Sequence, residues 1–314
     1  MTIIRDFSEI NGYYTACIGF FDGVHRGHRF LLEHLKAEAR SNNTLSAVIT
    51  FANHPRKLIQ PDFQLHLINT FEERLENLAS TGIDVCFVFD FTEEIRNLTA
   101  KEFICGFLSE KLHVTKLLIG YDHRFGKDRA EGFESYVEYG NSCGMEVVQE
   151  PILDDGSNRN YSSSEVRRKL ISGDITEATT LLGQYYRLEG VVIHGHKLGR
   201  KLGFPTANLN PFEKDKIIPS TGVYAANVIL EEGLSYPSMV NIGFRPTVDK
   251  ESNRLSVEAH LIGFDGDLYG QTITIVFVER IRDERKMSSL GELKAQLAKD
   301  SAKVLEVLVE KSNP

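Results

Sequence analysis

The sequence predicts an α/β domain with a doubly wound parallel sheet, followed by an antiparallel β domain and a closing helix. Up to about residue 183, short apolar runs alternate with helical patterns, and from about residue 185 the hydrophobic period changes to two. The length of 314 residues also favours two domains, since a domain typically has roughly 100–200 residues. We therefore predict one domain over residues 1–183 and a second over residues 184–314.

The first domain contains five predicted strands, most of them largely apolar, as expected of strands that are covered on both faces. They lie at residues 16–21, 45–51, 85–91, 116–122 and 145–153. Helical patterns separate them over residues 28–40, 71–81 and 99–112, and in the first of these Leu31, Leu35 and Ala39 share a face. Strands and helices in alternation predict a parallel sheet with helices on both sides.

The second domain contains short strands with period two, separated by Gly, Pro, Asn and Asp turns. They lie at residues 187–195, 222–230, 236–243, 254–263 and 272–281. This pattern predicts an antiparallel barrel or sandwich. A helical pattern over residues 288–308 closes the chain, with an apolar stripe formed by Leu290, Leu293, Leu297 and Val304.

The composition narrows the class of protein. The formal net charge of −8 disfavours a general nucleic-acid binder. The N-terminus shows no basic segment followed by an apolar core, and no apolar run approaches the ~18–20 residues that span a bilayer, so we expect neither a signal peptide nor a membrane partner. The four cysteines form no CxxC pair, which favours reduced thiols in a cytoplasmic protein. The sequence leaves self-association open.

The stretch GFFDGVHRGH, residues 19–28, predicts a phosphate site. It follows the first predicted strand, and ligands of α/β sheets bind at the carboxyl ends of the strands. The N-terminus of the next helix attracts phosphate, and His25 and His28 are spaced to share one helical face. The stretch YSSSEVRRKL, residues 161–170, places hydroxyls and arginine at another helix start. The alternatives are surface histidines and an ordinary N-cap with a solvated basic face.

These motifs resemble the nucleotidylyltransferase superfamily, which uses HxGH and a serine-rich loop to transfer AMP from ATP. With TFANHP (50–55) and GYDHRFGKDRAEG (120–132), the chain resembles the adenylyltransferase module of bacterial FAD synthetases. It departs from that family at Asn53, where Pro is common, and at His123, where an aromatic residue is common.

The resemblance implies a set of roles in the first domain. His25 and His28 would donate to the ATP phosphates, Ser163 and Arg167 would close on them, and Mg²⁺ would balance the leaving pyrophosphate. Asp122 and Phe125 would lie near the flavin nucleotide. The remaining nucleotide-binding positions would be Gly19, Phe21, Asp22 and Gly27.

The stretch GVVIHGHKLGRKLGFPTANL, residues 190–209, predicts a second phosphate site. Its glycines allow close backbone approach, and its basic residues add positive charge; they are Gly195, Gly199, Gly203, Lys197, Arg200 and Lys201. Thr206 and Asn208 would point to one side of a strand and offer hard oxygen ligands for Mg²⁺. In residues 254–261, Glu258 is a candidate base. The alternatives are an exposed glycine-rich hairpin and a solvated glutamate.

Together with GVYAA (222–226), NIGFRPTV (241–248) and DLYG (267–270), these residues resemble the riboflavin kinase family. The resemblance implies a six-stranded barrel with a C-terminal helix, Thr206 and Asn208 as holders of Mg²⁺–ATP, and Glu258 as the group that activates the 5′-hydroxyl of riboflavin. Both modules on one chain imply phosphorylation of riboflavin to FMN and adenylylation of FMN to FAD and pyrophosphate. The rival hypotheses are a nucleotidylyltransferase with another acceptor and a flavin-binding regulator without turnover.

Overall fold

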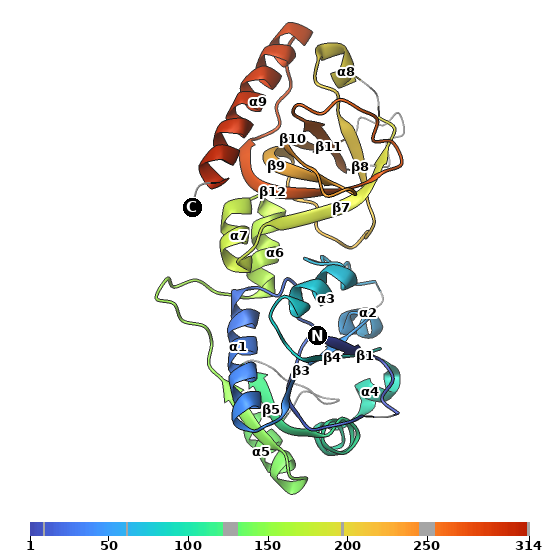
Figure 1. Ribbon diagram of the computed structural model, residues 1–314, viewed down its shortest axis with the longest axis vertical. Coiled ribbons are helices and arrows are strands. Elements are labelled where there is room, and N and C mark those ends of the chain that lie inside the picture. Colours follow the sequence, from blue (N-terminus) through green and yellow to red (C-terminus); the bar gives the residue numbers. More distant parts are fainter. Residues whose placement is uncertain (9, 61, 122–130, 196–197, 245–254, 313–314) are drawn as a thin grey trace. The chain divides into compact units, whose positions relative to one another are not determined.

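The protein consists of two compact units (Figure 1). The structure, a computed structural model, describes all residues except 9, 61, 122–130, 196–197, 245–254 and 313–314. Unit 1 comprises Met1–Leu65 and Asn69–Ser162, and unit 2 comprises His66–Ile68 and Ser163–Pro314.

Unit 1 is built on a six-stranded sheet in which every strand pair is parallel, as predicted. The strand order is β1-β4-β3-β2-β5-β6. The strands are β1 (Thr2–Ile4), β2 (Tyr14–Ile18), β3 (Leu45–Phe51), β4 (Val85–Phe89), β5 (Val114–Gly120) and β6 (Glu146–Glu150). The short edge strand β1 was not predicted.

Apolar cores lie on both faces of this sheet, because side chains alternate along each strand. In β2, Ala16 and Ile18 enter one core, while Cys17 enters the other with residues of α1. In that helix Leu32 and Leu35 are fully buried, and the predicted Leu31 is partly buried against the same core. The helices of unit 1 are α1 (Arg26–Ser41), α2 (Pro55–Ile59), α3 (Phe71–Ala79), α4 (Glu93–Asn97), the π-helix η1 (Glu102–Lys111) and α5 (Phe133–Ser142).

The strand order places a topological switch point at the end of β2. The chain proceeds from β2 to β3 and β4 on one side, and β5 then pairs with β2 on the other side. Ligands of open α/β sheets bind at the carboxyl ends of strands where the order reverses. The loop that leads from β2 into α1 therefore occupies the expected position of a site.

Unit 2 is built on a closed antiparallel barrel. Of the two predicted alternatives, a barrel or a sandwich, the barrel is therefore correct. The order is β10-β11-β8-β7-β12-β9, and β9 pairs with β10 to close it. The strands are β7 (Tyr186–Ile193), β8 (Ala207–Pro211), β9 (Gly222–Leu230), β10 (Ser235–Phe244), β11 (Leu255–Leu261) and β12 (Thr272–Arg282). The helices are α6 (Ser163–Ser172), α7 (Ile175–Leu182), α8 (Leu198–Leu202) and α9 (Leu290–Ser312).

The closing helix α9 packs against β9, β10 and β12. Val304, Val307 and Leu308 are buried there with barrel residues. Leu290, predicted on the same stripe, is 61% exposed, because it is the first residue of the helix and takes no part in that core. Within the described part of the chain, no helix combines the length and the apolar character needed to cross a membrane.

Two further segments complete unit 2. Helix α7 packs against β7 and β12, and α6 packs against α7. The short segment His66–Ile68 pairs with the stretch before β9: the backbone N–H of Leu67 donates to the carbonyl of Asp215 at 2.8 Å, and that of Ile217 donates to the carbonyl of Leu67 at 3.0 Å. Unit 2 therefore includes α6 and α7, which precede the barrel, and the short segment His66–Ile68.

Candidate active sites

The first site is formed where the loop after β2 enters α1. His25 is the N-cap of α1, and its Nδ1 accepts a hydrogen bond from the backbone N–H of His28 at 3.3 Å. The two imidazole rings are stacked, with centroids 3.7 Å apart and planes 18° apart. The spacing of the two histidines therefore brings them together at a helix N-terminus, as predicted, where the helix dipole favours an anion.

The backbone of this loop is strained. Phe21 and Val24 have φ angles of 57° and 41°, in the left-handed region that residues with a side chain rarely adopt, and both are buried. Such conformations cost about 1–3 kcal/mol each and persist only where the surroundings enforce them. The Phe21 ring lies edge-on to the His28 ring at 5.1 Å, so the strained residue also contacts the histidine pair.

Two glycines of the motif stand where neighbouring atoms leave no free space for a side chain. A Cβ at Gly27 would lie 2.9 Å from the carbonyl oxygen of Tyr161 and 3.2 Å from the His25 ring. A Cβ at Gly19 would lie 3.1 Å from the Phe21 ring. Asp22 is buried, and its Oδ1 accepts from the backbone N–H of Asn69 at 3.1 Å, so its carboxylate helps to hold the loop in place.

A polar cluster that the motif analysis did not identify joins α1 to the segment before α6. Arg26 donates to the Tyr161 hydroxyl at 3.0 Å and pairs with Asp155 at 3.3 Å. Hydrogen bonds from Ser157 and Tyr161, with a smaller effect of Arg26, lower the pKa of Asp155 to about 2. Arg26 thus holds the segment that leads into the serine-rich loop. In the sequence, only its position between His25 and His28 indicated that it could belong to the site.

The other predicted residues of the first site are distributed as follows. Ser163 is the first residue of α6, and Arg167, in the same helix, donates through Nε to the carbonyl of His66 at 2.8 Å. Asp122, His123 and Phe125 lie outside the described residues. Asn53, where the resembling family commonly has Pro, donates to the carbonyl of Phe91 at 3.2 Å and accepts from its N–H at 2.7 Å. The departure at position 53 therefore links two loops at the carboxyl end of the sheet.

The second site lies on neighbouring barrel strands. Glu258 of β11 is directly opposite Asn208 of β8 and Asn241 of β10. Thr206, just before β8, donates through Oγ1 to Oε2 of Glu258 at 3.3 Å. The structure therefore brings together the three side chains that the sequence analysis selected.

Two cavities meet at Thr206. One, of about 370 Å³, is lined by Arg200, Thr206 and the loop of residues 264–269. The other, of about 280 Å³, is lined by Thr206, Glu258, Asn241 and apolar side chains that include Met239 and Leu297. A polar cavity beside a more apolar cavity that is lined by the Glu258 carboxylate suits transfer between a nucleotide and an aromatic acceptor.

The glycine-rich stretch fits closely around this junction. A Cβ at Gly195 would lie 2.3 Å from the Asn208 amide nitrogen, and one at Gly199 would lie 2.3 Å from the carbonyl oxygen of Phe204. Gly203 has a φ of 87°, which favours glycine. Lys197 lies outside the described residues.

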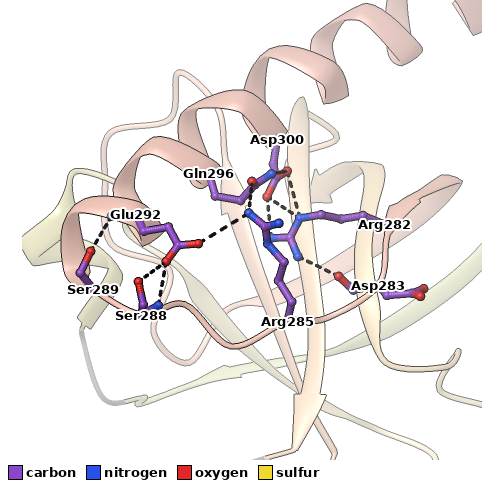
Figure 2. A network of polar contacts seen from close by, with 8 residues as sticks. All are labelled: Arg282, Asp283, Arg285, Ser288, Ser289, Glu292, Gln296 and Asp300. Carbon is purple, nitrogen blue, oxygen red and sulfur yellow. Dashed lines mark hydrogen bonds and ion pairs between the residues drawn. The ribbon is translucent and has the colours of Figure 1, made fainter.

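The wall of the smaller cavity is held by a polar network between β12 and α9 (Figure 2). Arg282 and Arg285 line the cavity. Arg282 donates to both carboxylate oxygens of Asp300, and Gln296 donates to Asp300 at 2.7 Å while accepting from Arg285 at 2.8 Å. The network fixes residues 283–289, the connection that forms this side of the cavity.

The donor set at the junction fits Mg²⁺. No group of three or more His, Cys, Asp or Glu that could hold a metal ion exists among the residues that the structure describes. However, Thr206 and Asn208 offer a hydroxyl and an amide oxygen beside the Glu258 carboxylate. Mg²⁺ commonly takes one or two protein oxygens and completes its shell with phosphates and water, so these few ligands suffice.

Comparison with known proteins identifies the family to which this chain belongs. The FAD synthetase family matches residues 8–165, and the riboflavin kinase family matches residues 182–308. A bifunctional riboflavin kinase/FMN adenylyltransferase of Escherichia coli strain K12 is 38% identical over 283 residues, which cover 90% of this chain and 89% of that protein. This chain belongs to the family of bifunctional riboflavin kinases/FMN adenylyltransferases.

Other members of this bifunctional family show similar agreement. The protein of that name from Bacillus subtilis strain 168 is 34% identical over 291 residues, covering 92% of this chain and 90% of that one. Among solved structures, a crystal structure named as a macrolide-efflux protein from Streptococcus pneumoniae superimposes with a TM-score of 0.85, at 28% identity over 96% of this chain and 97% of that chain. The FAD synthetase match contains the histidine site, and the riboflavin kinase match contains the barrel site.

Proposed function

We propose that this chain phosphorylates riboflavin to FMN at the barrel site and adenylylates FMN to FAD at the histidine site, with ATP as the donor in both steps. The family supports both activities. The observation that carries the kinase assignment is the junction of two cavities at Thr206, with Glu258 beside it. We further propose that the activities divide near residue 183, and that the protein works in the cytoplasm on riboflavin, FMN, FAD and ATP.

In the kinase step, Glu258 would accept the proton of the riboflavin 5′-hydroxyl. The hydroxyl oxygen attacks the γ-phosphorus of ATP, the bond to the β-phosphate oxygen breaks, and ADP leaves. Thr206 and Asn208 would hold Mg²⁺, which neutralises charge on the phosphates when it is bound. Phosphoryl transfer depends mainly on positioning and electrostatics, and the fixed register of Glu258 with Asn208 suits that requirement.

In the adenylylation step, the nucleophile is already ionised. An oxygen of the FMN phosphate attacks the α-phosphorus of ATP, and the bond to pyrophosphate breaks, so no strong base is needed. His25, His28 and the first N–H groups of α1 would donate to the ATP phosphates. Ser163 and Arg167 complete the proposed phosphate contacts, and Asp122 and Phe125 the proposed flavin contacts.

The test is to incubate the protein with riboflavin and Mg²⁺–ATP and to separate FMN and FAD by chromatography. Production of both supports the proposal. Failure to convert added FMN to FAD would indicate a nucleotidylyltransferase with another acceptor, and ligand binding without turnover would indicate a flavin-binding regulator.

A single variant separates the two steps. His28→Ala removes a donor to the developing pyrophosphate charge, and loss of such a donor typically costs about 10²–10³ in rate. FMN should accumulate while riboflavin is consumed at the wild-type rate. Wild-type FAD output from added FMN would contradict the role of His28.

A further inference from the structure

A buried arginine contacts the loop that leads into the first site. Arg74 of α3 is 2% exposed and is among the largest fully buried side chains of the described chain. Its Nη1 donates to the carbonyl of Phe20 at 2.8 Å, and its Nη2 donates to the carbonyl of Phe51 at 2.6 Å. Phe51 ends β3, and Phe20 lies just beyond the end of β2. One guanidinium therefore joins the carboxyl ends of two neighbouring strands at the switch point.

These carbonyls lie where the strand ladder ends, and buried carbonyls need a partner. The Phe51 carbonyl is buried, and the partly buried Phe20 carbonyl also accepts from the Thr50 hydroxyl at 3.3 Å. A planar guanidinium can serve two of them at once, which a lysine ammonium cannot do with the same geometry. The guanidinium carbon also lies 3.8 Å from the centroid of the Phe20 ring, within the range of a cation–π contact. Burial lowers the pKa of Arg74 to about 10, partly opposed by the Asp22 carboxylate, so the side chain stays protonated at neutral pH.

The beginning of α3 holds the same loop at a second point. The backbone N–H of Asn69 donates to Asp22, and the Asn69 side chain donates to Glu73 at 3.3 Å. Glu73 also forms the capping box of α3 with Thr70. The two anchored residues, Phe20 and Asp22, flank the strained Phe21, and the loop then leads directly into His25. Local surroundings of this kind are what a strained backbone requires in order to persist.

We propose that Arg74 is a positioning residue for FMN adenylylation. It holds the strained loop of residues 19–25, so that the N-cap His25 and the stacked His28 meet the phosphates in a fixed geometry. This inference rests on the adenylylation proposed above for the histidine site. Rates of positioned reactions are sensitive to displacement, since an error of about 1 Å can cost about 10²-fold.

A purely structural role would give a different result, and the same sheet offers a matched control. At the opposite, amino end of β3, the carboxylate of Asp84 accepts from the backbone N–H and the hydroxyl of Ser46 at 2.9 and 2.6 Å. Asp84→Asn weakens the sheet at the end away from the site. If Arg74 acts only through stability, its variants and Asp84→Asn should behave alike.

The experiment uses full-length Arg74→Met, Arg74→Lys and Asp84→Asn, assayed well below the unfolding temperature of each. We expect Arg74→Met to lower kcat of FMN adenylylation by about 10²-fold, with a smaller change in KM. Arg74→Lys should recover part of that loss, because its ammonium keeps the charge and reaches one carbonyl. Asp84→Asn should retain kcat, and the kinase step of every variant should match wild type as an internal measure of folded protein.

Wild-type kcat of adenylylation in Arg74→Met, or an equal fall in Asp84→Asn, would overturn the inference. If Arg74→Met does not fold, Arg74→Lys decides: a reduced kcat supports the positioning role, and an unchanged kcat overturns it. A wild-type chain that makes FMN but no FAD would instead overturn the proposed adenylylation, and this inference with it.

Discussion

Replacing Asp300 by asparagine should loosen α9 from the barrel. The Asp300 carboxylate is 3% exposed and accepts from Nε of Arg282 at 3.0 and 3.1 Å and from Nη2 at 2.7 Å. Asparagine keeps the size and one acceptor oxygen but removes the negative charge. Loss of one partner of a buried ion pair typically costs about 3–5 kcal/mol. We expect about 3 kcal/mol, because the Arg282 side chain is 22% exposed and still donates to the Asp283 carbonyl.

The assay is thermal unfolding followed by circular dichroism, together with the kinase activity that remains after heating. For a unit of this size, each kcal/mol shifts Tm by roughly 2–4 °C, so we expect the barrel unit to unfold about 6–12 °C lower. The KM for riboflavin should rise, since Arg282 and Arg285 line the cavity beside Glu258. The matched control is Glu306→Gln, which removes an exposed ion pair with Lys303 on the same helix and should change stability by less than about 1 kcal/mol.

Two results would refute this reasoning. A loss of less than about 1 kcal/mol in Asp300→Asn would mean that water replaces the carboxylate without the penalty expected of a buried pair. A large loss of stability with an unchanged KM for riboflavin would mean that the network does not shape the cavity.

Four further outcomes are expected. Glu258→Gln should lower riboflavin phosphorylation by about 10²–10⁴-fold and leave conversion of added FMN to FAD intact; near wild-type FMN formation would make Glu258 an ordinary glutamate. Thr206→Ala should raise the Mg²⁺ concentration needed by the kinase step, and a magnesium titration identical to wild type would refute the ligand role. The pKa of Asp155 is lowered to about 2 in the folded chain from an ordinary 3.8, so its stabilising effect is present above about pH 4 and is lost as pH falls toward 2. The free energy of unfolding of Asp155→Asn should lack this pH dependence. An equal slope of that free energy against pH in wild type and variant would contradict the prediction. The fragment 184–314, expressed alone, should convert riboflavin to FMN and no further. The fragment 163–314 should unfold at a higher temperature than 184–314, because it keeps α7 against β7 and β12. A folded fragment without kinase activity would show that the kinase site needs other parts of the chain.

The fold was largely predictable because the strands of unit 1 are short apolar runs between helical patterns, while those of the barrel alternate with period two. The strand at 222–230 was placed with the bounds that the structure gives, since period two and flanking turns define it. The edge strand β1 has three residues and gives no period. The helical pattern at 99–112 contains a π-helix, because apolar spacing alone does not separate i→i+5 from i→i+4 hydrogen bonding.

The candidate sites were predictable where chemistry and spacing coincide in a short stretch. His25 and His28 are three residues apart, and Thr206 and Asn208 are two apart, so local geometry brings each pair together. Arg74 has no such signal, because its partners are backbone carbonyls of residues 20 and 51, and a carbonyl is not identified by any residue type. Long-range partners such as Arg282 and Asp300 likewise become visible only once the barrel and α9 are assembled.

The short segment His66–Ile68 has a consequence for synthesis of the chain. The polypeptide enters unit 2 for three residues, returns to unit 1, and enters unit 2 again at Ser163. On a ribosome, unit 1 is complete in sequence once Ser162 has emerged, but Leu67 has to wait for Asp215 and Ile217 before its backbone is paired. At about 5–20 residues per second, roughly 8 to 30 seconds pass between the synthesis of Leu67 and that of Ile217. During this interval the backbone of Leu67 lacks the partners that it has in the folded chain, so the translation rate between these points sets how long it is open to other strand partners.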